Sequence, residues 1–544
     1  MKLRSLLLAL HGLCFAFLAS TSSARAEQEQ LGVVSFPVSC AESQRVAFSR
    51  GVALLHDFWY EEAAPQFTRI AKADPSCAMA HWGIAMSGFR QIWDRPDEAA
   101  MAQGWHEMQL AQSSPAKSAR EREYIAALSD FFRPGKPGYE TRINAYATAM
   151  GNLYAHYPDD VDAGAFYALA LLAAASPDDL SLDAQHRAMA VLTPLWHKFP
   201  DHPGLVHYII HACDTPSLAQ DGLAAARHYG EIAASGPHAV HMPGHIFARL
   251  GMWPEDIQSN LASVAASQAA EARHQSGWMD QFHSDDFLLY AYLQSGQDAR
   301  ARALVNDATQ VISHYEAMAG SHPEHYMTGM FPYYRMKFQI FLALEMRDWN
   351  SAAKLTAIKS APPETQMQIY WARAIAHGHL HQAEAARADL AGYDGVIAAL
   401  KKTRHAYYAD STDAKIIRGE ILAWIAFAEH RAPDAVAHMR ESADLQDKVG
   451  QGEVDIPARE MLGDILLESS KPQEALMEYQ RALQLSPNRF NGLFNAGRAA
   501  EEAGDRSQAV HYYSALLKST DNGSQTQRPE IAHARQSLLA AAGT

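Results

Sequence analysis

The sequence predicts an all-α protein, a right-handed solenoid of paired helices. Near the C-terminus, small residues and an aromatic recur every 34 residues: Gly463, Ala475, Tyr479, Ala482 and Pro487, then Gly497, Ala509 and Tyr513. The same register appears near the start of the chain, at Gly51, Ala63, Phe67 and Pro75. No segment alternates apolar and polar residues as a half-buried strand does, and no strand–helix–strand pattern occurs. Small residues let two helices cross closely, so this period indicates stacked helix pairs.

Apolar periodicity, proline and glycine place the other helices in order. After the opening pair, helices are expected over residues 76–90, 119–132, 138–157, 162–175 and 183–198. A histidine-rich region contributes 207–213, 218–234, 238–250 and 254–272. The array continues over 278–295, 299–316, 328–346, 349–358, 364–378, 381–400, 411–429 and 432–448. We expect the first helix of each pair to line a concave groove and the second to lie outside it.

Residues 1–26 have the features of a secretory signal peptide. Lys2 and Arg4 precede an apolar run, and Ala24-Arg25-Ala26 forms a cleavage site. We expect export of the chain from Glu27 onward to the periplasm or the cell exterior, in a bacterium. No later segment is apolar enough over its length to span a membrane. Residues 27–448 are expected to form an irregular repeat array with the histidine-rich groove, and residues 449–544 regular repeats.

The overall charge disfavours nucleic acid as a partner. The chain carries a formal net charge of −15. Loss of the signal peptide removes Lys2, Arg4 and Arg25 and no acidic residue, so the mature charge is −18. An acidic surface without basic runs repels phosphate backbones and anionic membranes. A groove of stacked helix pairs is instead expected to admit a protein or peptide partner.

Three cysteines remain after the signal peptide. In an oxidising compartment Cys40 and Cys77 can form a disulfide that pins the N-terminal segment to the first helix pair. Cys213 is then left over. We expect it to be a small buried apolar residue, although its place beside the histidines leaves a ligand role open.

Two histidine triplets are the main candidate for a functional site. His207, His211 and Asp214 are spaced i, i+4 and i+7, and His238, His241 and His245 are spaced i, i+3 and i+7. On a helix each triplet projects from one face. Both lie on consecutive first helices, which should pack side by side. Imidazole and carboxylate groups bind zinc, copper and iron, so the five histidines His207, His211, His238, His241 and His245 are expected to hold a transition metal.

Several other residues can add to this site. The next first helix carries His283, Asp286 and Tyr290, which are further ligands or partners of ligands. Asp214 is either a ligand or an acceptor that orients a ligand histidine. Pro243 removes a backbone donor inside the second histidine helix, and should kink or tighten it. The histidines of HGHLH at 377–381 are expected to be exposed to solvent.

The repeat resembles the tetratricopeptide repeat (TPR), a helix–turn–helix of 34 residues. Most of the mature chain is similar to a group of exported bacterial TPR proteins, through CAMAHWGIAM at 77–86, HYIIHACD at 207–214, PHAVHMPGHIF at 237–247 and PAREMLGDILLE at 457–468. The group, marked by HYxxHxxD and PHxxHMPxHIF, brings no assigned reaction. QDKVGQGEVDIP at 446–457 departs from it, because a longer basic and proline-rich loop is expected there.

Three functions stay open on these grounds. The groove can simply hold a metal, which is the interpretation we adopt, or the histidines can be structural parts of a protein-interaction scaffold. Alternatively, the metal serves an oxidoreductase or hydrolase of unknown substrate, with Asp214, Asp286 or Tyr290 as acid–base group. The motifs of zinc proteases, serine hydrolases, P-loops and dinucleotide-binding folds do not occur. The covalent haem motif is also missing, so haem would have to be held by histidines alone.

Overall fold

The structure is a computed structural model that describes residues 29–92, 95–114, 118–135, 138–176, 179, 181–319, 330–356, 361–403, 406–450, 452 and 454–542. The expected signal peptide lies outside these ranges. Within them the regular structure is helical and no strand occurs, so the predicted all-α fold is confirmed. Among the same residues no helix combines the length and the apolar character that a membrane crossing requires.

The first helices form a stack that starts at the N-terminal segment. After the short 3-10 helix η1 (Glu42–Gln44) come α1 (Arg45–His56), α2 (Tyr60–Ala73), α3 (Ala78–Phe89), α4 (Glu98–Ser113), α5 (Ala119–Phe132), α6 (Tyr139–His156), α7 (Val161–Ala174) and α8 (Asp183–Lys198). Two of these, α5 and α8, have the predicted bounds. At α5 the Ser118 side chain accepts from the Glu121 backbone N–H, and Glu121 accepts from that of Ser118, which fixes the start of the helix.

The middle of the chain carries the histidine motifs. It comprises α9 (Pro203–Cys213), α10 (Ala219–Ile232), α11 (Pro237–His241), α12 (Pro243–Arg249), α13 (Trp253–Ala272), α14 (Trp278–Gln294), α15 (Asp298–Ala319) and α16 (Met330–Glu345). The helix predicted over 238–250 is therefore two helices. Pro243 has no N–H to donate, and the His245 N–H bonds to the Met242 carbonyl three residues back, so the turn is tightened as predicted.

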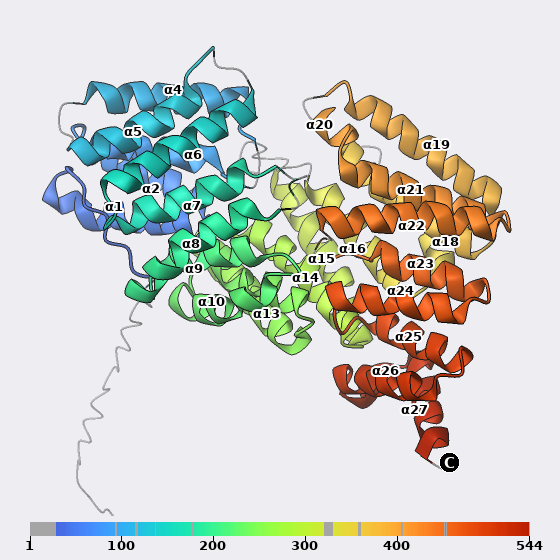
Figure 1. Cartoon of the computed structure of the whole chain (residues 1–544). Helices are drawn as coiled ribbons and strands as arrows, with labels where there is room; N and C mark the ends of the chain where they lie inside the picture. Colours follow the sequence, from blue (N-terminus) through green and yellow to red (C-terminus); the bar gives the residue numbers. More distant parts are fainter. Residues whose placement is uncertain are drawn as a thin grey trace, which may run out of the picture.

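The last part of the chain completes the array. It comprises α17 (Trp349–Ala352), α18 (Pro363–His379), α19 (Ala383–Leu400), α20 (Ala406–Ala409), α21 (Thr412–Ala428), α22 (Ala432–Val449), α23 (Ala458–Glu468), α24 (Pro472–Leu485), α25 (Phe490–Glu502), α26 (Arg506–Ser519), the 3-10 helix η3 (Asp521–Gly523) and α27 (Pro529–Ala542). Figure 1 shows the helices packed in successive antiparallel pairs from α1 to α27, as in a solenoid.

The sequence pattern does not predict helices α4, α20 and α27. Helix α4 buries only four residues, Gly104, Glu107, Met108 and Ala111, so its apolar periodicity is weak. Its place is set by close packing instead. A Cβ at Gly104 would lie 2.3 Å from the Phe132 ring of α5, so only glycine allows this contact.

The 34-residue period is visible as a repeated contact between glycine and an aromatic ring. A Cβ at Gly463 would lie 2.6 Å from the Tyr479 ring, and one at Gly497 would lie 2.5 Å from Tyr513. At the other end of the chain the corresponding distance from Gly51 to the Phe67 ring is 2.7 Å. Glycine at position 8 of the unit therefore makes room for the aromatic at position 24, which confirms the predicted repeat packing.

The hydrophobic core is divided into two clusters next to the histidine helices. One cluster runs from Leu31 to Phe247 and also includes Ala270. The other begins at Ala248 and runs through Trp253 and Trp278 to Ala534. The regular C-terminal repeats thus share their core with the middle of the chain. The histidine motifs lie where the two clusters meet.

The C-terminal repeats also dock on the turn that follows the second histidine motif. Trp253 Nε1–H donates to the Asn488 carbonyl at 2.8 Å, and Asn488 Nδ2 donates to the Gly251 carbonyl at 3.2 Å. Gly251 has φ +62°, and a Cβ there would lie 2.3 Å from the Pro487 carbonyl oxygen. The turn between α12 and α13 can therefore pack against the turn between α24 and α25 only because residue 251 is glycine.

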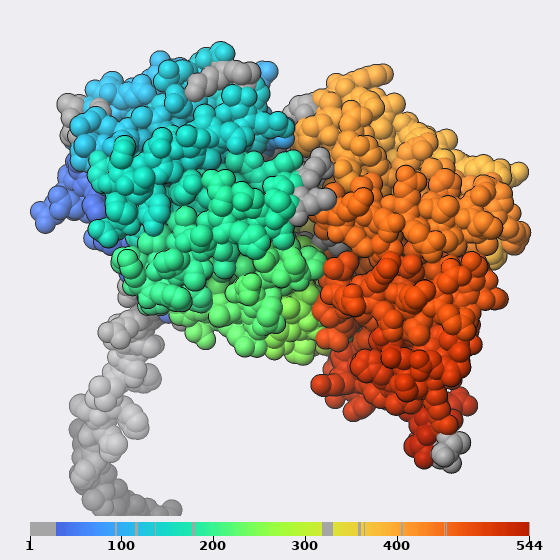
Figure 2. Space-filling view, viewed as in Figure 1, coloured from blue at the N-terminus to red at the C-terminus, as the bar shows by residue number. Residues whose placement is uncertain are grey.

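At the top of the view in Figure 2, a notch separates the α4–α7 region from the α19–α21 region, while the middle of the chain lies below it and the C-terminal end lies at the lower right. A cavity of about 220 Å³ lies between the segment that follows α9 and the region of α22 and α23. Thr215–Ser217 line one side of it, and residues 446–450 and Arg459 line the other. Its first wall begins directly after Asp214, so it adjoins the end of the first histidine motif.

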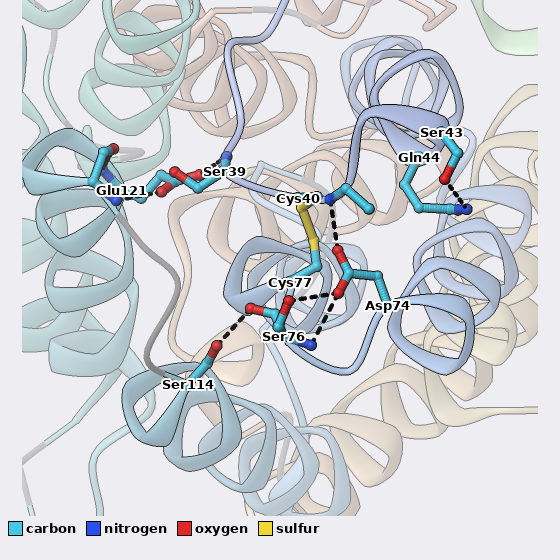
Figure 3. The surroundings of a disulfide bond; sticks show 11 residues. Ser39, Cys40, Ser43, Gln44, Asp74, Ser76, Cys77, Ser114 and Glu121 are labelled. Carbon is cyan, nitrogen blue, oxygen red and sulfur yellow. Dashed lines mark hydrogen bonds between the residues drawn. A yellow bond between two sulfur atoms is a disulfide. The ribbon is translucent and has the colours of Figure 1, made fainter.

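Cys40 and Cys77 are joined in a disulfide (Figure 3). Asp74 supports the same corner, since it accepts from the Ala41 N–H at 2.7 Å and from the Ser76 hydroxyl at 2.6 Å. Ser114 Oγ donates to the Ser76 carbonyl at 2.6 Å. The disulfide and the Ala41–Asp74 bond fasten the N-terminal segment to the α2–α3 turn, and the Ser114 bond ties that turn to the end of α4.

Candidate metal centre

Four helices bring the histidines together. His207 and His211 come from α9, His238 and His241 from α11, His245 from α12 and His283 from α14. Pro203 and Pro237 occupy the first positions of α9 and α11, where the missing N–H costs no helix bond. The residues form two groups of three whose nitrogen atoms lie within 4.8 Å of one another: His207, His211 and His238, and His241, His245 and His283. We call them the first and the second triad.

In the first triad one ring is fixed by a backbone contact. His207 Nδ1–H donates to the His56 carbonyl at 2.5 Å, which leaves the Nε2 lone pair of His207 available. That Nε2 lies 3.1 Å from the Nε2 of His211. His238 completes the group, with Nδ1 3.9 Å from the Asp280 carboxylate.

In the second triad two rings are fixed. His241 Nδ1–H donates at 2.7 Å to Asn260 Oδ1, whose own Nδ2 donates to Asp256. His245 Nδ1–H donates at 2.9 Å to Asp214, which also accepts from Arg249 Nε at 2.9 Å. Both Nε2 atoms are then lone-pair donors, and they face each other at 3.0 Å. Two such lone pairs repel unless a proton or a metal cation lies between them.

The spacing of the facing nitrogens suits a common metal ion. Zinc–imidazole bonds of about 2.0–2.1 Å in a tetrahedral shell place two ligand nitrogens about 3.3 Å apart. The observed Nε2···Nε2 separations are 3.1 Å for His207 with His211 and 3.0 Å for His241 with His245. Small ring rotations therefore allow each pair to supply two ligands to one metal ion. His238 supplies the third ligand in the first triad, and His283 supplies it in the second.

One phenylalanine covers each triad. The Phe58 ring centroid lies 4.4 Å from that of His207, 5.4 Å from His211 and 5.6 Å from His238. The Phe287 ring lies 4.8 Å from His241, 4.7 Å from His245 and 5.5 Å from His283. Apolar rings of this kind keep water from a metal site and lower its local dielectric.

The rings sit inside the helical layer. His207, His238, His241 and His245 are 0%, 2%, 0% and 9% exposed, whereas His211 and His283 are only partly buried. Burial, together with the neighbouring imidazoles, lowers the pKa of His207 and of His238 well below the usual range. Both rings are therefore neutral at physiological pH, the form that binds metals.

A second buried network holds the backbone behind the first triad. Asp162 accepts from His56 Nε2–H at 3.0 Å and from His202 Nε2–H at 3.3 Å, and Tyr208 O–H donates to His56 Nδ1 at 2.9 Å. Burial is the main reason why the pKa of His56 falls to about 4. A Cβ at Gly204 would lie 2.3 Å from this ring. Since the His56 carbonyl orients His207, the network supports the triad from outside.

The other predicted site residues have different surroundings. Asp214 bonds His245 and Arg249, so it lies beside the triads as an acceptor. Asp286 forms an ion pair with Lys337 of α16. Tyr290 donates its O–H to the Asp455 carbonyl at 3.0 Å and contacts Arg489. The Asp286 and Tyr290 contacts lead to the second hydrophobic cluster, whereas His283 joins the second triad.

The remaining cysteine and histidine candidates are structural. Cys213 is buried with its thiol 3.6 Å from the Met189 sulfur, and burial raises the pKa of the thiol to about 12, which makes it a poor ligand. The expectation that the HGHLH histidines are exposed is wrong for two of them. His377 is buried and bonds Asp389 at 2.7 Å, and His379 stacks on Trp349. Cys40, Asp74 and Cys77 also lie close together, but the disulfide consumes both thiolates.

Sequence spacing offers no signal for the supporting residues. Phe58 and His56 are separated from His207 by about 150 positions, and neither belongs to a local motif. Asn260 lies on α13, which presents no histidine. Gly244 is a weak clue, because a Cβ there would lie 2.8 Å from Asn260 Nδ2. Only the packing of repeat on repeat brings these residues to the triads.

The comparisons with known proteins add little. No family model and no curated protein matches the chain. Among solved structures, the TPR domain of P58(IPK), a crystal structure at 2.5 Å, is similar at 15% sequence identity and a TM-score of 0.22. The match covers 70% of this chain and 99% of that domain.

Proposed function

We propose that the protein is an exported TPR-like scaffold that binds transition-metal ions through its two histidine triads. The observation that carries the proposal is the pair His241 and His245. Both Nδ1–H groups are committed to oxygen acceptors, so both Nε2 lone pairs point at one volume from 3.0 Å apart. A bound cation turns this repulsion into two coordinate bonds. Copper, zinc and iron all suit imidazole donors.

The donor set fits a site that is held ready for its ion. His207, His241 and His245 each have an oxygen acceptor on the far side of the ring, an arrangement that fixes the ring's orientation and strengthens the donor nitrogen. Three imidazoles leave at least one coordination position for water or another small ligand. The site is thus compatible with storage of a metal and with metal-dependent chemistry on a small molecule. Haem is disfavoured, because the facing Nε2 atoms, 3.0 and 3.1 Å apart, are too close to bind opposite faces of one haem plane.

Metal analysis tests the proposal. The exported chain, purified without a histidine tag, should retain bound copper, zinc or iron after dialysis against a weak chelator. The His207→Ala and His241→Ala variants should each retain less, and the double variant none. His186→Ala is the matched control, because His186 is an exposed histidine on α8. Equal metal content in the double variant and the control would refute the site.

The scaffold alternative has its own supporting observation. The cavity of about 220 Å³ is lined by Thr215–Ser217 on one side and by residues 446–450 on the other. A peptide bound there would contact both of these segments. If the chain binds no metal and the histidine variants fold as stably as the wild type, the protein is an interaction scaffold with structural histidines. Export, membership in the exported TPR group and cleavage after Ala26 belong to the proposal as well. The disulfide suits an oxidising compartment, and the mass of the mature chain tests the cleavage.

A further inference from the structure

The two triads are neighbours rather than separate sites. Within the first triad the ring centroids lie up to 6.4 Å apart, between His211 and His238. Across the triads His238 and His241 are 6.0 Å apart, and His211 and His245 are 6.5 Å apart. The separations across the triads are therefore about equal to the largest separation within the first triad. The six rings form one continuous cluster.

Helix α11 gives each triad one ring. His238 belongs to the first triad and His241 to the second, and they are three residues apart on the same helix. Residues at this spacing are neighbours on one helix face. His211 and His245 extend toward each other from α9 and α12. The positions of two bound ions are thus tied together by the backbone on one side and by facing side chains on the other.

Charge requires a further ligand between such ions. Two divalent ions would bring four positive charges into a buried volume whose ligating imidazoles supply no negative charge. The nearby carboxyl groups are Asp214, which already pairs with Arg249, Asp256, which accepts from Asn260, and Asp280, 3.9 Å from His238 Nδ1. Uncompensated buried charge costs several kilocalories per ion. A small anion that touches both ions offsets this cost most directly.

We propose that the two triads form a single two-metal centre, in which the ions share one bridging oxygen ligand, hydroxide in the divalent state. This inference rests on the proposed metal binding and adds the number of ions and their coupling. Each triad offers three imidazoles, which leaves at least one coordination position of a bound ion open. Paired ions about 3.5–4 Å apart act jointly on a small oxygen ligand bound between them. The centre is therefore built to bind water, hydroxide or dioxygen rather than a large substrate.

Reconstitution of the exported chain with Cu(II) alone tests the pairing. Two Cu(II) ions that share an oxygen bridge couple their unpaired spins, so their paramagnetic resonance signal is largely lost. Two separate Cu(II) ions each keep a full signal. We expect two copper ions per chain by elemental analysis and a spin count far below the copper content. The control variant His186→Ala, which removes an exposed histidine, should give the same copper content and the same low spin count as the wild type.

Removal of one triad should restore the signal. In His283→Ala the first triad stays complete, so one copper per chain and one full spin per copper are expected. His211→Ala is the equivalent variant of the first triad, and it guards against a folding defect in either one. Both residues are only partly buried.

The possible results separate the pairing from the metal binding itself. Two copper ions with a full spin count, or a single ion per chain in the wild type, would overturn the two-metal centre and leave the proposed function intact. A wild-type chain that takes up no copper, zinc or iron would overturn both.

Discussion

The Nδ1 contacts of three histidines decide which nitrogen of each ring faces a metal. His207 donates to a backbone carbonyl, His241 to the Asn260 amide oxygen and His245 to the Asp214 carboxylate. Each acceptor fixes one tautomer of the neutral ring, so that Nε2 carries the lone pair. The three acceptors come from different parts of the chain, and each is held in turn by a further contact. Metal affinity should therefore depend on residues that never touch the ion.

Asn260→Ala tests this dependence. Loss of the amide oxygen frees the His241 ring to rotate and to carry its proton on Nε2, so metal affinity should fall about 10- to 100-fold. Competition with a chromophoric chelator measures it. Ser267→Ala is the control, because Ser267 is buried on the same helix and its hydroxyl has no hydrogen-bond partner among the described residues. Equal losses in the two variants would mean that Asn260 only supports the fold.

Glu420, a buried carboxyl group outside the histidine triads, contributes to the pH dependence of stability. Burial, with a smaller contribution from Asp455, raises the pKa of Glu420 well above its usual range, and Trp371 Nε1–H donates to the carboxyl at 2.6 Å. The folded chain then keeps a proton that the unfolded chain releases. Glu420 therefore stabilises the folded chain fully at pH values below its pKa in the unfolded chain. This stabilisation is lost as pH rises through the higher pKa of Glu420 in the folded chain.

Glu420→Gln should remove this part of the pH dependence. The amide keeps an oxygen for Trp371 and has no proton to lose. Relative to the wild type, the variant's free energy of unfolding should rise by about 1.4 kcal/mol or more between about pH 5 and about pH 8, since that energy is a tenfold change in proton affinity. Chemical denaturation at each pH measures it. Glu384→Gln, on the exposed face of α19, is the control, and its free energy of unfolding should follow that of the wild type at every pH. The same pH response in both variants would show that Glu420 is not the source of this pH dependence.

Helical spacing was sufficient to choose the histidines but not their partners. A face repeats every three or four residues, so His207 with His211 and His238 with His241 follow from the sequence. The division into two triads does not. It depends on the tightened turn at Pro243 and on the inward position of His283, which only the packed helices define. Asp286 and Tyr290 share the helix of His283, yet their contacts lie with Lys337 and Arg489.

At the level of elements, close contact between a glycine and an aromatic ring sets the register of each helix pair. The contact recurs at Gly51, Gly463 and Gly497, and the period could be read from the sequence because the contact needs those two residue types. Helix α4 has no such period and was missed. It buries only four residues, and most of its other side chains are exposed.

Gly463→Ala and Gly395→Ala form a matched pair that tests the contact. A methyl group at Gly463 would lie 2.6 Å from the Tyr479 ring, so the helices must separate and the protein should lose about 1–3 kcal/mol of stability. Gly395 lies inside α19 with nothing within 4 Å of its added Cβ, so alanine should stabilise that helix by about 0.5–1 kcal/mol. Thermal or urea unfolding gives both values. A stability gain at both positions would show that glycine 463 is not needed for close packing.

For the whole molecule, the histidine cluster lies at the boundary between two hydrophobic cores. Phe58, over the first triad, belongs to the N-terminal core, and Phe287, over the second, belongs to the C-terminal core. The turn at Gly251 then carries the C-terminal repeats. In a linear repeat array each unit is stabilised only by its neighbours, so one weak boundary can let the two sides unfold separately. A metal centre whose ligands come from both sides of such a boundary would hold the two sides of the array together.

Metal removal should therefore weaken the boundary more than either core. At a free metal concentration of about a hundred times the dissociation constant, binding adds about 2.7 kcal/mol to the stability of the folded state. Hydrogen exchange measured with and without metal should show the largest slowing in α9, α11, α12 and α14, with little change in α5 or α26, which lie far along the array on either side. In the His207→Ala and His241→Ala double variant, metal should have no effect on any helix. Uniform slowing of all helices, or slowing that persists in the double variant, would show that the ions do not join the two cores through these histidines.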